Sequence, residues 1–228
     1  MTDLKLFGTD GIRGVANEFP LTPEFITRIG SAIGQVLGRE ATRPRALIGR
    51  DTRQSGAMIE NALAAGLMAQ GFDTLHVGVL TTPGIAYLTR ALGARCGISI
   101  SASHNPFEDN GIKVFGADGF KIPDAHENEI ETLAQSARRE GTSAAIGQRR
   151  DDESPITNYL NFLLNTVKRA KILTGTRVAV DCNNGATFDL AQRALSALGA
   201  QVIGVDIKDE TLAFAKTIGA RHVMPSQT

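Results

Sequence analysis

A dense polar cluster follows a short apolar stretch between Gly97 and Gly119, which reads GISISASHNPFEDNGIKVFGADG. Ser103 and His104 are adjacent in this cluster, and Lys113 follows ten residues after Ser103. The Asn-Pro dipeptide after His104 favours a turn that directs the serine and the histidine away from the preceding strand. A hydroxyl flanked by an imidazole and an ammonium group suits phosphoryl transfer, in which cations and positioned donors stabilise charge.

The sequence lacks the signatures of several other reaction classes. Ser103 is not part of a GxSxG nucleophile elbow, and the chain contains no GxxxxGK[ST] loop, no GxGxxG and no HExxH. Each residue also has a plain structural interpretation. Ser103 could cap a strand end, His104 could be structural, and Lys113 could be a surface lysine. Taken singly, these residues do not decide between the alternatives.

Two further polar segments supply candidate ligands. The first is FGTDGIRG (7–14), whose glycines allow a ligand to approach the backbone while Thr9 and Arg13 donate hydrogen bonds. Arg13 could instead simply hold the N-terminal segment in place. The second is GRDTRQSG (49–56), which we interpret as a helix-capping loop with Asp51 or Ser55 accepting from backbone amides.

Strands that alternate with helices must position these segments. Thr22 followed by Pro23 predicts a helix start, and Gly38 predicts its end. Further helices are expected at 55–70, 82–92 and about 123–139, and strands at 46–49, 74–79 and 96–100, with shorter extended pieces in IKVF and GFKI. This alternation predicts an α/β fold, in which ligands bind beyond the carboxyl ends of the strands.

The second half of the chain repeats this plan. Residues 45–79 and 177–206 both run from Arg through an apolar strand, a polar loop containing Asp, an Ala/Leu-rich helix and Gly to a second apolar strand. We therefore expect a first domain at 1–150 and a similar but incomplete second domain at 155–228. Residues 141–155 are expected to be a linker, with the charged run 149–153 solvated. The tail departs from the pattern from about 206, with a helix expected near 212–218.

Composition excludes several classes of partner. Lys plus Arg equals Asp plus Glu at 24 each, which argues against nucleic-acid binding. No apolar run approaches 18 residues, so no signal peptide or membrane span is expected. Cys96 and Cys182 are isolated and are expected to be reduced thiols in the cytoplasm.

In order, FGTDGIRG, GRDTRQSG and SISASHNPFEDNGIKVFGADG resemble the α-D-phosphohexomutases over roughly residues 4–205. The resemblance implies a three-layer α/β/α first domain and a sugar phosphate as the small-molecule partner. FGTDGIRG favours interconversion of glucosamine 6-phosphate and glucosamine 1-phosphate, on the route to UDP-N-acetylglucosamine. The alternatives are family members that act on mannose or glucose phosphates, or a truncated product without catalysis.

The resemblance also implies roles for single residues. Ser103 would carry a phosphoryl group, pass it to the sugar to give a bisphosphate, and take one back after the sugar reorients. His104 and Lys113 would flank the phosphate, with Thr9 and Arg13 framing the same site. Mg²⁺ would bind an oxygen of phosphorylated Ser103 and offset the added charge of about −1.5 to −2.

The chain departs from the family pattern in its second half. The DGDxDR-type loop that would supply the remaining Mg²⁺ ligands is absent, as are the sugar-selecting Glu-x-Ser-Gly-His loop and the phosphate-binding fourth domain. We therefore expect an N-terminal portion with little or no activity on its own. The resemblance also allows a homodimer in a full-length protein.

Overall fold

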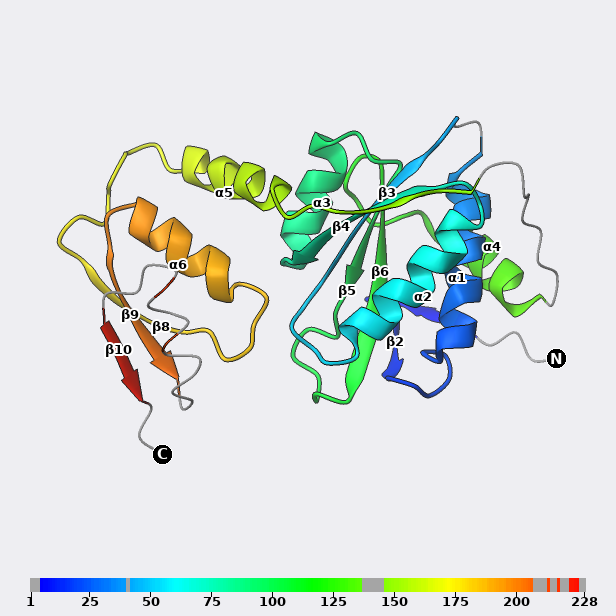
Figure 1. Cartoon of the computed structure of the whole chain (residues 1–228), viewed down its shortest axis with the longest axis horizontal. Coiled ribbons are helices and arrows are strands. Elements are labelled where there is room, and N and C mark those ends of the chain that lie inside the picture. The colour runs from blue at the N-terminus through cyan, green and yellow to red at the C-terminus, as the bar shows by residue number, and fades with distance from the viewer. Residues whose placement is uncertain are drawn as a thin grey trace. The chain divides into compact units, whose positions relative to one another are not determined.

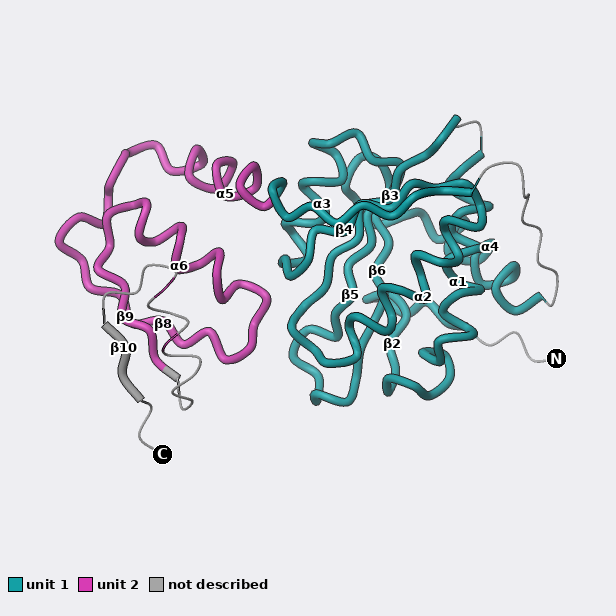
Figure 2. The backbone as a smooth tube through the Cα atoms, viewed as in Figure 1, with its two compact units in different colours: residues 1–155 teal, residues 156–228 magenta. Residues whose placement is uncertain are grey.

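The computed structural model describes residues 5–39, 42–136, 146–206, 213, 217 and 222–225 (Figure 1). The chain divides into two compact units, residues 1–155 and 156–228 (Figure 2). The first unit carries the polar segments singled out in the sequence.

A seven-stranded mixed sheet forms the centre of the first unit, in the order β1-β2-β6-β5-β3-β4-β7. The strands β5, β3, β4 and β7 run parallel to one another, whereas β6 pairs antiparallel with both β5 and β2. Their bounds are β1 Phe7–Gly8, β2 Gly11–Val15, β3 Arg45–Arg50, β4 Asp73–Val79, β5 Cys96–Ile100, β6 Asp109–Gly116 and β7 Arg149–Asp151.

Among the described residues of this unit, four helices accompany the sheet: α1 Pro23–Leu37, α2 Gly56–Met68, α3 Thr82–Ala91 and α4 Asp124–Gln135. Thr22 caps α1, because its Oγ1 accepts from the backbone N–H of Phe25, and Gly38 follows the last turn as predicted. The end predicted for α4 near residue 139 lies outside the described residues.

Helices cover both faces of the sheet. Ala46 and Ile48 of β3 belong to the core cluster that contains the apolar residues of α1 and α2. Gly49 of β3 instead faces α3, since a Cβ there would lie 3.0 Å from Ile85 Cδ1. Side chains alternate between the two faces of a strand, so α3 lies on the face opposite α1 and α2 (Figure 1). This arrangement confirms the predicted α/β fold class.

The helices α1 and α2 cross at two glycines. A Cβ on Gly66 would lie 2.1 Å from Thr27 O, and a Cβ on Gly30 would lie 2.3 Å from Leu63 O. The two backbones are therefore close enough that only a hydrogen atom fits between them. The two helices are therefore packed tightly against each other.

The charged run 149–153 is mostly exposed as predicted, but its first residues form a strand where a linker was expected. Arg149–Asp151 form β7, which pairs parallel with β4 at the edge of the sheet. The Arg149 guanidinium donates to the Asp151 carboxylate at 2.6 Å, and both side chains face solvent in part. A short charged strand suits an edge because it discourages pairing with another chain. Residues 141–145 lie outside the described part of the chain.

The extended segment expected at GFKI is much smaller than predicted. It makes a single bridge, between Lys121 and Phe115 of β6. The other extended piece, IKVF, is part of β6.

The second unit contains α5 Pro155–Thr166, β8 Arg177–Asp181, α6 Phe188–Ala197, β9 Gln201–Asp206 and β10 His222–Pro225. Its strands form a parallel sheet in the order β10-β9-β8. The run β8-α6-β9 has the same parallel strand–helix–strand plan as β3-α2-β4, as the sequence repeat suggested. The helix expected near 212–218 falls mostly on residues outside the described part. No described helix is both long and apolar enough to cross a membrane.

The two cysteines differ in their surroundings, and neither forms a disulfide. Cys96 is fully buried in β5, and this burial raises the pKa of its thiol to about 12, so the reactive thiolate is scarce near pH 8. Cys182 is half-buried. We expect Ellman's reagent at pH 8 to modify Cys182 in the folded chain and Cys96 only after unfolding. Prompt modification of both thiols under native conditions would contradict the buried position of Cys96.

Candidate functional site

The polar cluster of the sequence forms the connection between β5 and β6. Ile100 pairs with Ile112, and the Ser101 N–H donates to Gly111 O at 2.9 Å, so the strands remain paired up to this point. Residues 102–108 therefore form a loop beyond the carboxyl end of β5. The next strand, β6, begins at Asp109.

Ser103 and His104 lie together on the exposed side of this loop. The two atoms Ser103 Oγ and His104 Nδ1 are 3.3 Å apart. Ser103 adopts a left-handed backbone conformation with φ of 58°, which is uncommon outside glycine. Its N–H donates to Ser101 Oγ at 3.0 Å. The structure therefore presents the serine hydroxyl outward, with the imidazole beside it.

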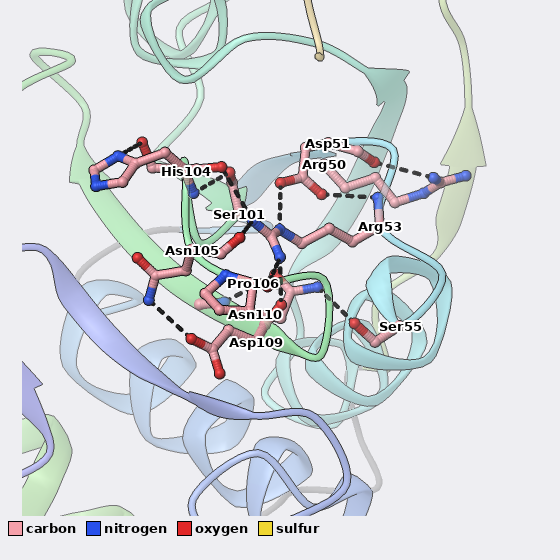
Figure 3. Close-up of polar contacts among 12 residues, drawn as sticks. Arg50, Asp51, Arg53, Ser55, Ser101, His104, Asn105, Pro106, Asp109 and Asn110 are labelled. Carbon is pink, nitrogen blue, oxygen red and sulfur yellow. Dashed lines mark hydrogen bonds and ion pairs between the residues drawn. The ribbon is translucent and has the colours of Figure 1, made fainter. Parts of the chain in front are cut away.

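The guanidinium of Arg53 binds backbone carbonyl groups of this loop and of the first residue of β6 (Figure 3). It donates to the carbonyl oxygens of Ser103 at 3.0 Å, Asn105 at 2.9 Å and Asp109 at 2.9 Å, and also to that of Pro106. The side chain of Arg53 is only 11% exposed. Hydrogen bonds to a charged donor are stronger than neutral ones, and they gain further strength when buried.

Asp51 pairs with Arg53 from the same segment. Its Oδ2 accepts from Arg53 Nε at 3.1 Å, and its Oδ1 accepts from the Arg53 N–H at 3.0 Å. The Asp51 N–H donates to Ile100 O, which ties this segment to the end of β5. Because β3 and β5 are neighbours in the sheet, the segments that follow them meet.

The prediction that this segment caps α2 through Asp51 or Ser55 is wrong. Asp51 does accept from a backbone amide, but that amide is the N–H of Arg53, which precedes the helix. Ser55 makes no side-chain hydrogen bond as the N-cap of α2. Its Oγ instead accepts from Nδ2 of the buried Asn110, at 2.9 Å.

Thr9 and Asp10 form the tip of the hairpin between β1 and β2. Gly11 has a φ of 87°, and a Cβ there would lie 2.3 Å from Ile112 O, so this position requires glycine. A hollow of about 510 Å³ is lined by residues 5–11 and Arg13. Thr9 is exposed at this hollow.

Arg13 connects the hairpin to the loop. Its Nη1 donates to Asn105 Oδ1 at 3.2 Å, and Asn105 Nδ2 donates to Asp109 Oδ2 at 2.9 Å. Arg13 Nη2 donates to Asp10 at 2.9 Å, while its Nε is buried without a hydrogen-bond partner among the described residues. Lys113 Nζ lies 3.7 Å from the other oxygen of Asp10. Asp10 therefore lies between two cations.

Glu131 of α4 anchors the start of the hairpin from the core side. Its buried carboxylate accepts from the N–H groups of Leu6, at 2.8 Å, and Phe7, at 2.6 Å. This bond fixes the chain immediately before Thr9. A buried carboxylate between two backbone donors has no local sequence pattern, so sequence reasoning missed it.

The structure therefore places the five candidate residues of the sequence on two neighbouring segments. Ser103 and His104 are in contact, and Arg13 reaches their loop through Asn105. Within the described part of the chain, no hydrogen bond or ion pair joins Lys113 to Ser103. Sequence reasoning missed the contributions of Arg53, Asn105 and Asp10.

The described residues do not form a complete metal site. They contain no group of three or more His, Cys, Asp or Glu side chains that could hold an ion. Ser103 offers a single exposed oxygen. Mg²⁺ binds six oxygens, several of which are usually those of water and phosphate, so Ser103 supplies only part of such a ligand set.

A family model for phosphoglucomutase/phosphomannomutase, alpha/beta/alpha domain I, matches residues 4–140. The chain belongs to this phosphohexomutase family. The match spans both the hairpin and the loop of Ser103, and the observed layers agree with the family description.

The names of curated relatives of this phosphohexomutase chain are more specific than the name of the family model. The chain is 47% identical over 220 residues to the phosphoglucosamine mutase of Oceanobacillus iheyensis, covering 96% of this chain and 49% of that protein. It is 44% identical over 216 residues to the phosphoglucosamine mutase of Delftia acidovorans, covering 95% and 48%. The chain thus spans about half the length of the curated relatives it matches.

A solved structure agrees with the family assignment. The phosphoglucomutase/phosphomannomutase family protein of Burkholderia thailandensis matches with a TM-score of 0.71 and 26% identity. The match covers 88% of this chain and 43% of that protein.

Proposed function

We propose that this chain carries the phosphoserine loop of a phosphoglucosamine mutase, which interconverts glucosamine 6-phosphate and glucosamine 1-phosphate. The observation that carries the proposal is the exposed Ser103 hydroxyl beside His104 Nδ1, at 3.3 Å. The names of the relatives at 44–47% identity support the choice of sugar.

The proposed reaction is two balanced phosphoryl transfers. In the first, the bond between phosphorus and Ser103 Oγ breaks while phosphorus bonds to the free hydroxyl oxygen of the sugar monophosphate. The proton of that hydroxyl leaves, and Ser103 Oγ gains a proton. In the second, after the bisphosphate turns, Ser103 Oγ bonds to the other phosphorus, the sugar oxygen leaves and takes up a proton, and the serine loses its own.

His104 and Lys113 are the proposed proton-handling and charge-stabilising groups. His104 Nδ1 is close enough to Ser103 Oγ to hold the proton that the serine gives up or regains. The cations Arg13 and Lys113 lie at Asp10, and an incoming phosphate would compete with that carboxylate for them. Thr9 would add a hydroxyl donor at the same hairpin. These contacts favour the transition state, in which charge spreads over the phosphoryl oxygens.

Members of this family generally use a metal ion. We propose that Mg²⁺ binds an oxygen of phosphorylated Ser103, where it would neutralise phosphoryl charge.

Phosphoryl uptake by the chain itself tests this function. We expect incubation with glucosamine 1,6-bisphosphate and Mg²⁺ to add one phosphoryl group, seen by intact-mass spectrometry and mapped by peptide analysis to Ser103. Because a complete metal site is missing from the described residues, we expect uptake without sustained turnover in a coupled mutase assay. Absence of uptake, or uptake at another residue, would refute the proposed role of Ser103.

A further inference from the structure

We propose that Arg53 is the positioning residue of the phosphoserine loop, and that it acts through the shape of its guanidinium and not as a phosphate ligand. The inference rests on the proposed phosphoryl transfer at Ser103. It assigns a role to the GRDTRQSG segment that a capping loop does not explain.

The conformation of Ser103 requires support from its surroundings. A left-handed backbone conformation costs free energy in any residue other than glycine, and Ser103 has a φ of 58°. Both backbone polar groups of this residue are bound by side chains: its N–H by Ser101 Oγ and its C=O by Arg53 Nη2. Arg53 therefore acts on the residue that bears the nucleophile.

The donors of Arg53 are all in use. An arginine side chain has five N–H groups in a planar fork. Nε donates to Asp51, Nη1 to the carbonyls of Pro106 and Asp109, and Nη2 to those of Ser103 and Asn105. None is left for a phosphate, and Asp51 offsets the charge. Arg13 differs, because its Nε has no partner among the described residues.

Lysine cannot reproduce this arrangement. Its donors all lie on one nitrogen, whereas the carbonyls bound by Arg53 come from four positions between Ser103 and Asp109. Arg53→Lys keeps the positive charge and removes the fork. It therefore separates positioning from electrostatics.

The test compares Arg53→Lys with Arg45→Lys in this chain. Arg45 lies at the opposite end of β3, where its Nη2 donates to the single carbonyl of Leu92 at 3.0 Å. For Arg53→Lys we expect amide hydrogen exchange of residues 101–111 to rise about tenfold or more, because buried charged hydrogen bonds are lost. We also expect the maximal rate of phosphoryl uptake from glucosamine 1,6-bisphosphate to fall about 100-fold. The half-saturating concentration should match that of Arg45→Lys, and the melting temperature shows whether both variants fold.

Each result decides the proposal. An unchanged uptake rate with an unchanged exchange pattern overturns it. A large rise in the half-saturating concentration at an unchanged maximal rate also overturns it, since that is the behaviour of a phosphate ligand. If wild-type chain takes up no phosphoryl group, the proposed function fails, and exchange in residues 101–111 still decides the positioning role.

A second variant covers the case in which Arg53→Lys does not fold. Asp51→Asn preserves the arginine and removes one charged acceptor of its Nε. We expect faster exchange confined to residues 101–111, with a smaller increase than in Arg53→Lys. Exchange identical to wild type in that segment would contradict the proposal.

Discussion

Replacing Ser103 with alanine is expected to reduce phosphoryl uptake from glucosamine 1,6-bisphosphate to less than about one thousandth of the wild-type rate. The hydroxyl oxygen is the atom proposed to bond to phosphorus, and alanine has no nucleophile in its place. Ser103 is exposed, so the variant should fold normally. A time course of intact mass measures the rate, and the melting temperature checks the fold.

Ser101→Ala is the matched control. Ser101 is two residues away, and its Oγ accepts from the Ser103 N–H but is not the proposed nucleophile. We expect this variant to retain uptake at a reduced rate, with the phosphoryl group still on Ser103. The assignment fails if Ser103→Ala takes up phosphate normally, or if Ser101→Ala is the variant that loses uptake.

The largest loss of stability is expected from Gly66→Ala. In an exposed helix this change would stabilise by roughly 1 kcal/mol. Here the new Cβ would lie 2.1 Å from Thr27 O and 2.6 Å from Ser31 N, and backbone atoms cannot move aside as a flexible side chain can. Overpacking of this kind costs about 1–3 kcal/mol and at times more. Because α1 and α2 would have to separate, the clash should dominate, and we expect a net loss of about 2 kcal/mol.

Gly8→Ala is the control for that measurement, since its Cβ would meet only Gly11 O, at an ordinary 3.6 Å. Urea denaturation followed by circular dichroism gives the free energy of unfolding, and the access of Ellman's reagent to Cys96 gives a second probe of the same unit. Equal stability of Gly66→Ala and wild type would show that the two helices are farther apart than described.

Local sequence patterns were sufficient to predict most of the helices and strands of the first unit. Thr22 and Pro23 begin α1 because a hydroxyl cap and a preset φ act within one turn. Apolar runs predicted β3, β4 and β5, since buried parallel strands are apolar on both faces. The adjacency of Ser103 and His104 also follows from the chain itself, and the motif in which they lie indicated the family.

Other features depended on contacts between distant segments. The edge strand β7 consists of charged residues and pairs only because β4 offers an open edge. The β1–β2 hairpin is too short to show a pattern, and it is held by Glu131 from α4. No local propensity encodes either contact.

The contacts that hold the loop of Ser103 likewise depended on tertiary structure. The sequence identified Ser103 by its neighbours, but Arg53 binds backbone carbonyls, which every residue has and no motif distinguishes. The two meet because β3 and β5 are adjacent in the sheet, so that the segments after their carboxyl ends share one edge. Local chemistry thus identified Ser103 as the candidate residue, whereas strand order determined which arginine binds its loop.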